Sequence, residues 1–156
     1  LDEITKDQKL FCINNLLGIE GFYIYIPETV QKIEEEAFID CENLEIVEFH
    51  SSYLLFEITS FCFAFSGLKT INLPRSIEII RDSSFYFCSN LKNIDLYNTN
   101  IKYIGHSAFS GTSIEKLVFP NSIQCIENHA FENTNFLKNV DFSHCYKIKS
   151  SININR

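Results

Sequence analysis

The chain carries six cysteines and four histidines, the residue types that most often supply nucleophiles and metal ligands. It contains neither a Cys-x-x-Cys pair nor a Cys/His cluster with the spacing of a zinc site. We therefore expect the thiols to be free and mostly buried, where they act as small apolar groups. They belong to Cys12, Cys41, Cys62, Cys88, Cys125 and Cys145.

The histidines and the one run of acidic residues also lack a catalytic arrangement. No histidine is placed beside a Cys or Asp so as to activate a nucleophile. Residues 34–36, all Glu, fall between apolar positions and are expected to cover an outer turn rather than to converge on a metal ion. Only five glycines are present, and no Gly-rich phosphate loop is among them. The sequence thus predicts no enzyme activity, no cofactor and no metal site. The histidines are His50, His106, His129 and His144.

The rest of the sequence is organised by an internal repeat of about 23 residues, the kind of period that builds solenoids. Residues 21–44, 68–91 and 114–137 align without gaps on the pattern L-x-x-I-x-L-P-x-x-I-x-x-I-x-x-x-A-F-x-x-C-x-x-L. Residues 44–68 fit with one extra residue. Residues 91–114 gain one residue before Ile101 and lose one after Phe109.

Each repeat opens with alternating apolar residues, which is the periodicity of a β-strand. The first apolar column holds Ile24, Val47, Ile71, Ile94, Leu117 and Val140. All three prolines, Pro27, Pro74 and Pro120, follow the second apolar column directly. Because proline cannot donate a ladder hydrogen bond, it is expected to end the strand there.

Each repeat later carries a small residue followed by phenylalanine, as in Ala37 and Phe38. We expect the small residue to allow close packing while the ring enters a core that neighbouring repeats share. The predicted fold is a right-handed solenoid with one parallel β-sheet, short turns or 3-10 segments on the return side and little regular α-helix. The phenylalanines expected to stack are Phe38, Phe63, Phe85, Phe109 and Phe131.

The repeat pattern, with its proline and Ala-Phe positions, resembles the BspA-like leucine-rich repeats over residues 21–142. It departs from that pattern at the proline position, where His50, Tyr97 and Ser143 stand, and Thr134 replaces the cysteine in the fifth repeat. The resemblance implies a leucine-rich-repeat solenoid from a surface or adhesion-type protein. Such repeats are frequent in host-associated bacteria and parasitic protists, where they are associated with adhesion to host cells and matrix proteins.

The predicted organisation is five repeats and the strand of a sixth between two less regular ends. Residues 1–20 are interpreted as an N-terminal cap or a degenerate repeat, and residues 143–156 as an incomplete repeat or a C-terminal tail. The chain is expected to be a fragment of a longer array. The repeats span residues 21–43, 44–67, 68–90, 91–113 and 114–136, and the sixth strand lies within 137–142.

The outward positions beside the first apolar column are the candidate binding surface, because strand side chains alternate between faces and solenoids bind through extended sheets. Tyrosines supply contact area at low entropic cost, so Tyr23 and Tyr25 are the expected centre. The candidates are Tyr23, Tyr25, Ile46, Glu48, Thr70, Asn72, Asn93, Asp95, Lys116, Val118, Asn139 and Asp141.

Charge indicates the kind of partner. The net charge is −7, which argues against nucleic acid. Residues 1–60 carry −10 and residues 61–156 carry +3. No apolar run is long enough to insert into a membrane. The sequence favours a non-catalytic protein-recognition or adhesion module whose partner, by the resemblance, is a host or matrix protein.

Two alternatives stay open. One is a carbohydrate-binding module, because five tyrosines could stack on sugars. The other is an intracellular scaffold or regulatory solenoid, which the free thiols and the lack of an N-x-[ST] sequon favour. The localisation follows the same division: cell surface or secreted by resemblance, cytoplasmic otherwise. The tyrosines are Tyr23, Tyr25, Tyr53, Tyr97 and Tyr103.

Overall fold

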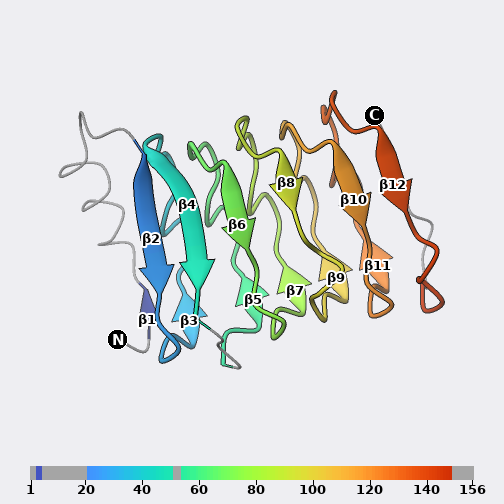
Figure 1. The fold of residues 1–156 in the computed structure, drawn as a ribbon, viewed down its shortest axis with the longest axis horizontal. Coiled ribbons are helices and arrows are strands. Elements are labelled where there is room, and N and C mark those ends of the chain that lie inside the picture. Colours follow the sequence, from blue (N-terminus) through green and yellow to red (C-terminus); the bar gives the residue numbers. More distant parts are fainter. Residues whose placement is uncertain (1–2, 5–20, 51–53, 149–156) are drawn as a thin grey trace.

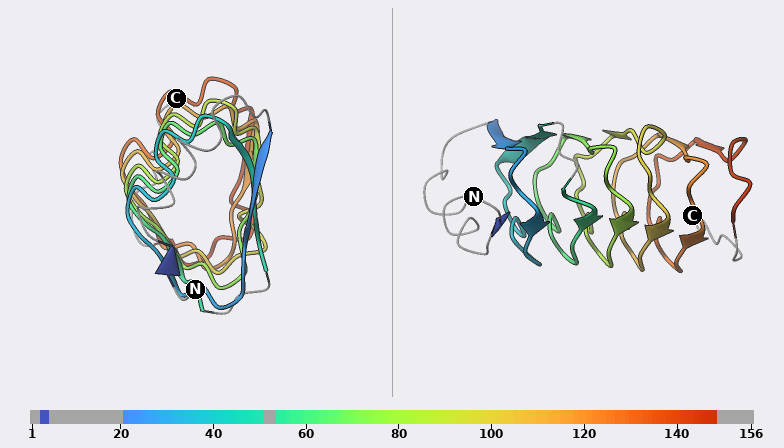
Figure 2. Two further views of the ribbon diagram at one scale, coloured as in Figure 1. Left: turned by 90° about the vertical axis from the view of Figure 1, so that its left-hand side faces the viewer. Right: turned by 90° about the horizontal axis from the view of Figure 1, so that it is seen from below.

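The computed structural model describes residues 3–4, 21–50 and 54–148, which wind into a right-handed parallel β-solenoid (Figure 1). Viewed along its axis, successive turns superpose into one flattened ring (Figure 2). The described residues contain strands and turns but no helix. The predicted solenoid is therefore confirmed.

One row of parallel strands forms the front of the molecule in Figure 1 and coincides with the predicted strand columns. The first four strands pair in sequence order into one sheet, and the last two form a separate ladder. The front sheet is thus interrupted between its fourth and fifth strands. The strands are β2 (Phe22–Ile26), β4 (Leu44–Phe49), β6 (Thr70–Asn72), β8 (Asn93–Ile94), β10 (Lys116–Val118) and β12 (Asn139–Asp141).

A second row of two-residue strands runs along the return side, which the sequence did not predict. β5, β7, β9 and β11 pair in parallel, and β1 pairs with β3 at the N-terminal end. From β3 on, each ends on a buried isoleucine of the repeat pattern, a β-branched residue that favours extended backbone. These strands are β1 (Glu3–Ile4), β3 (Lys32–Ile33), β5 (Glu57–Ile58), β7 (Ile79–Ile80), β9 (Tyr103–Ile104) and β11 (Cys125–Ile126).

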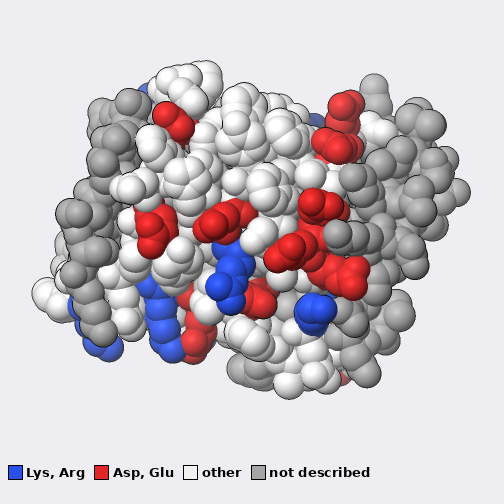
Figure 3. Space-filling view, turned by 180° about the vertical axis from the view of Figure 1, so that it is seen from behind, with Lys and Arg blue, Asp and Glu red and all other residues white. Residues whose placement is uncertain are grey.

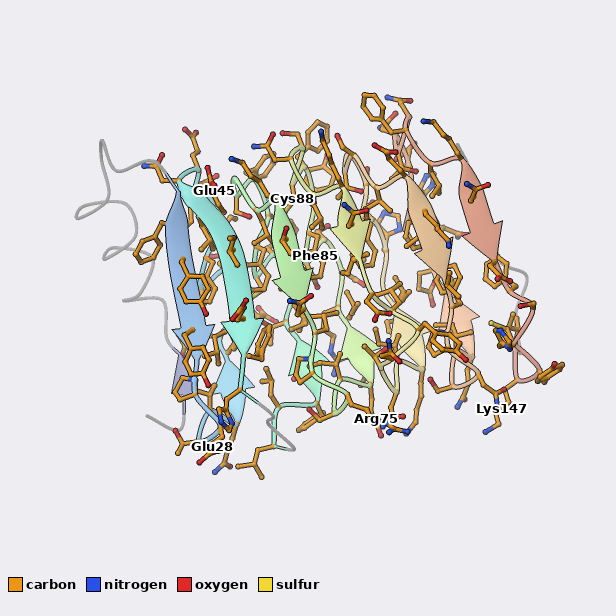
Figure 4. All side chains as sticks on the ribbon, in the orientation of Figure 1. Glu28, Glu45, Arg75, Phe85, Cys88 and Lys147 are labelled. Carbon is orange, nitrogen blue, oxygen red and sulfur yellow. The ribbon has the colours of Figure 1, made fainter. Side chains whose placement is uncertain are left out.

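The predicted phenylalanine spine lies at the centre of the core. Its five rings are almost fully buried and nearly parallel, with centroids of successive rings separated by 5.2, 5.4, 5.0 and 5.3 Å. Each ring therefore contacts the rings of the adjacent repeats, which makes the core continuous along the axis. Phe85, the middle ring, is labelled in Figure 4.

The backbone bends sharply on both sides of each spine residue. In the second repeat Phe61 and Phe65, two residues before and after Phe63, adopt φ of 54° and 58°, in the left-handed region. The same two positions have positive φ in every repeat, with Gly111 serving in the fourth. The small residue preceding each spine phenylalanine is fully buried, as predicted. These paired bends return the chain to the front row without a helix.

The five cysteines among the described residues are free, as predicted. Cys41 and Cys88 occupy one column with Ser66 between them, and the Ser66 hydroxyl lies 3.4 Å from the Cys88 sulfur. Burial raises the pKa of the Cys88 thiol to about 12 and raises the pKa of the Cys62 thiol as well. These thiols are unreactive core groups. Cys12 lies outside the described residues.

The two ends of the chain fall mostly outside the described residues. Of the segment 1–20, predicted as a cap or degenerate repeat, only β1 is described. Of residues 143–156, the described part ends at residue 148.

Candidate functional site

The predicted binding residues all lie on the front of the sheet. Ten of the twelve are exposed, and Glu48 and Val118 are half-buried. The strand register aligns them across the repeats: Tyr23 pairs with Ile46, Ile46 with Thr70 and Thr70 with Asn93. Beyond the interruption, Lys116 pairs with Asn139 and Val118 with Asp141. The face is therefore one surface made of two ladders.

The N-terminal part of this face carries exposed aromatic side chains. Tyr23, Tyr25 and Ile46 expose 45%, 49% and 36% of their surface on the two longest strands. The Tyr23 hydroxyl donates a 2.6 Å hydrogen bond to the Glu48 carboxylate, and that bond raises the pKa of Tyr23. The Tyr25 ring meets the ring of His50 edge to face at 6.1 Å. These contacts fix both tyrosine rings on the face.

The middle of the face is hollowed rather than flat. A depression of about 400 Å³ lies over β6, β8 and β10, where the ladder is interrupted. Six of the predicted residues line it, so the structure brings these six together and leaves the tyrosine pair apart. They are Thr70, Asn72, Asn93, Asp95, Lys116 and Val118.

The strands end in two alternating ways. Proline directly follows β2 and stands two residues after the ends of β6 and β10, whereas His50, Tyr97 and Ser143 hold the same repeat position after β4, β8 and β12. An acidic residue precedes each of these three by two positions. The Asp95 carboxylate accepts hydrogen bonds from the backbone and side-chain nitrogens of Asn98, at 3.3 and 2.5 Å. A carboxylate thus orders the turn where proline is absent.

Asp141 plays the same part in the sixth repeat. The Ser143 backbone N–H donates a 2.7 Å hydrogen bond to the Asp141 carboxylate, and this bond lowers the pKa of Asp141. In the second repeat the acid is Glu48, which accepts instead from Tyr23. Acidic residues on the face therefore hold local structure.

A larger depression, of about 600 Å³, lies at the carboxyl edge of the front strands, and the sequence reasoning did not assign it. The chain segments that follow β6, β8, β10 and β12 form it, and it shares Tyr97 with the depression on the face. Two sequence signals mark it: the extra residue before Ile101 and the column directly after the proline position. We call it the edge hollow.

Histidines, cysteines and acidic residues are the residue types of this chain that could do chemistry. The described residues include no group of three potential metal ligands among His, Cys, Asp and Glu. His50 pairs with Glu28 at 2.9 Å, and the rings of His106 and His129 meet at 5.3 Å on the opposite side of the repeat. In the described ranges there is also no helix long and apolar enough to cross a membrane.

Comparison with known proteins identifies the family. A family model described as the BspA type leucine-rich repeat region matches residues 20–138 in six copies. The chain belongs to this family. Its repeats commonly serve as protein-interaction modules.

Several solved structures share the fold. A leucine-rich repeat protein from Bacteroides ovatus is 28% identical with a TM-score of 0.71, over 78% of this chain and 33% of that one. The T. pallidum leucine-rich repeat protein TpLRR is 28% identical with a TM-score of 0.71, over 77% of this chain and 58% of that one. The pneumococcal vaccine antigen PcpA is 32% identical with a TM-score of 0.71, over 76% of this chain and 29% of that one. The chain thus spans between about a third and three fifths of these proteins. No curated protein sequence matches it.

Proposed function

We propose that the chain is a non-catalytic recognition module of a cell-surface or secreted protein, which binds a protein partner through the N-terminal part of the front sheet face. The observation that carries the proposal is the exposed apolar patch of Tyr23, Tyr25 and Ile46 on adjacent strands. Exposed aromatic side chains held in fixed positions are typical of the centres of protein interfaces. The resemblance to a pneumococcal antigen supports a surface location.

The surrounding charge specifies the partner further. Residues 1–60 carry −10, and Glu48 stands next to the tyrosines. From behind, acidic side chains gather toward the N-terminal end (Figure 3). A partner with basic residues around an apolar centre would associate faster in this field, and added salt would slow its association while leaving dissociation almost unchanged. By family resemblance, we propose that the partner is a host or matrix protein.

The test is the Tyr23→Ala/Tyr25→Ala double variant, measured by surface plasmon resonance against a panel of purified matrix proteins. The expected loss is more than 1 kcal/mol, about fivefold or more in affinity. Thr70→Ala/Asn72→Ala is the matched control, because these residues hold the same two positions on β6 and are also exposed. The control should change affinity less than twofold. Equal binding by the folded tyrosine variant and wild type would place the interface elsewhere.

A further inference from the structure

The edge hollow joins four successive repeats at one equivalent position. The residues directly after the proline column, Arg75, Asn98, Asn121 and His144, all line it. Figure 4 shows Arg75 and Lys147 on this edge, with Glu28 on the same edge at the N-terminal end. Glu28 also directly follows a proline, so the same column holds an acidic residue at the N-terminal end and Arg75 in the third repeat.

The cations of the hollow differ in their pairing from other lysines of the described repeats. Lys69, Lys102 and Lys138 each pair with a glutamate of the preceding repeat, at 2.6, 2.6 and 3.9 Å. By contrast, Arg75 and Lys147 form no ion pair within the described part of the chain, and no Asp or Glu is among the described residues that line the hollow. In a protein with a net charge of −7, two unpaired cations in one depression favour an anionic ligand.

Aromatic rings supply a second kind of contact. The rings of Tyr97 and His144 come together at 5.4 Å although their repeats are not adjacent. Tyr97 is 47% exposed and Tyr146 is 82% exposed, and both line the hollow. The face of an exposed aromatic ring suits the C–H surface of a pyranose ring, which is flat and weakly positive.

Polar groups of three successive residues of the hollow, Asn98 to Asn100, are held in place by hydrogen bonds within the protein. Asn98 donates its side-chain NH₂ to Asp95, which fixes the amide and leaves its oxygen available as an acceptor. The Thr99 hydroxyl donates to the Leu96 carbonyl at 2.6 Å, and the Asn100 backbone N–H donates to the Arg75 carbonyl at 3.2 Å. Preorganised acceptors and donors of this kind match sugar hydroxyls at low entropic cost.

We propose that the edge hollow binds an acidic saccharide, with Arg75 and Lys147 contacting its carboxylate or sulfate groups and Tyr97 and Tyr146 stacking on its rings. Asn98 and the neighbouring amides contact its hydroxyls. Positive charge alone would suit any anion, and aromatic rings alone would suit any sugar. The two together in one depression favour an acidic saccharide. The site lies apart from the Tyr23/Tyr25 patch, so the two proposals can fail independently.

The experiment is isothermal titration of the full chain with heparin hexasaccharide and hyaluronan hexasaccharide. Neutral chitohexaose, inorganic sulfate and polyglutamate serve as comparison probes. We expect at least one acidic hexasaccharide to bind at least tenfold more tightly than every comparison probe. Equal binding of chitohexaose would overturn the role of charge. Equal binding of sulfate would mean that the hollow binds simple anions, and equal binding of polyglutamate would make it a site for acidic polypeptide. No binding of either acidic saccharide at millimolar concentration would also overturn the proposal.

Variants separate this site from general electrostatic attraction. Arg75→Gln/Lys147→Gln should weaken binding at least tenfold. Lys69→Gln/Lys138→Gln, with the same loss of charge outside the hollow, should weaken it less than twofold. Tyr97→Ala, which leaves the charge unchanged, should weaken it at least threefold, and Tyr97→Phe should retain most of the affinity. Equal losses in the two charge variants, or no loss in a folded Tyr97→Ala protein, would refute the assignment.

Discussion

The two ends of the front face are built from the same repeat but differ in shape. At the N-terminal end, β2 and β4 are five and six residues long and pair with one register shift after Phe22, and they expose Tyr23, Tyr25 and Ile46. Toward the C-terminal end, β8 has two residues and the ladder is interrupted before β10, and one depression lies on the face and another at its edge. The extra residue of the fourth repeat, before Ile101, lies in this part of the chain. The same repeat thus builds an exposed aromatic surface at one end and depressions toward the other.

Both ends of the face rest on one shared core, and the largest expected effect is the loss of stability when that core is disrupted. Phe85 stacks on the rings before and after it, at 5.4 and 5.0 Å, and joins the two ends. Replacing Phe85 with Ala should lower the free energy of unfolding by about 3–5 kcal/mol, measured by urea denaturation, because it leaves a large cavity. Phe136→Ala, at a ring that is 57% exposed, should cost much less. A loss below about 1 kcal/mol at Phe85 would mean that the spine does not hold the two ends together.

The next largest expected effect is the pH dependence of stability that comes from two buried thiols. Folding raises the pKa of Cys88 from its ordinary value of 9.0 to about 12, and it raises the pKa of Cys62 in the same direction. The unfolded chain therefore loses thiol protons first, so the stability these thiols contribute is complete below pH 9 and falls above it. The expected slope is about 1.4 kcal/mol per pH unit for each thiol.

Urea denaturation at pH 8, 9 and 10 measures this slope, and Cys88→Ala should reduce it. Cys62→Ala should reduce it as well, because burial raises the pKa of that thiol too. Alkylation of the folded protein at pH 8 should follow the same order, with Cys125 and Cys145 modified before Cys62 and Cys88. Early modification of Cys88 would show that the core near the middle of the solenoid opens readily.

The smallest expected effect compares ion pairs from the two ends. Lys69 lies 2.6 Å from Glu45 in the N-terminal half, and Lys138 lies 3.9 Å from Glu115 in the C-terminal half, with both lysines exposed. Exposed pairs contribute about 0.2–1 kcal/mol or nothing measurable. Lys69→Ala should therefore cost a few tenths of a kcal/mol in thermal denaturation, and Lys138→Ala less. A cost above about 1 kcal/mol for either would show that side-chain pairs between repeats matter to the stack.

The features that depend on the repeat could be predicted from the sequence. The strand columns, the turns after proline and the buried rings from Phe38 to Phe131 follow from apolar spacing alone, because each position faces its equivalent in the next repeat. The outward direction of Tyr23 and Asn72 follows from strand alternation.

The features that depend on single side chains could not be predicted from the sequence. The second row of strands arises from pairs such as Ile79 and Ile80, too short for a periodic signal. The edge hollow depends on how the Asp95 carboxylate turns Asn98 and on the contact between Tyr97 and His144. The contact between Tyr97 and His144 does not repeat, and a carboxylate orders the turn in only two of the described repeats, at Asp95 and Asp141, so no column revealed them.

The alternation of strand ends has a consequence for how such an array is lengthened. The gap-free segments begin at Gly21, Leu68 and Ile114, and each contains one of the prolines. The module that recurs is therefore a pair of repeats, one with proline after the strand and one with an acidic residue two positions before the equivalent site. Inserting or removing whole pairs of repeats preserves the alternation of the two kinds of turn, whereas inserting a single repeat would place two turns of the same kind next to each other. A longer array that grows by pairs would therefore present the two kinds of turn alternately along one side.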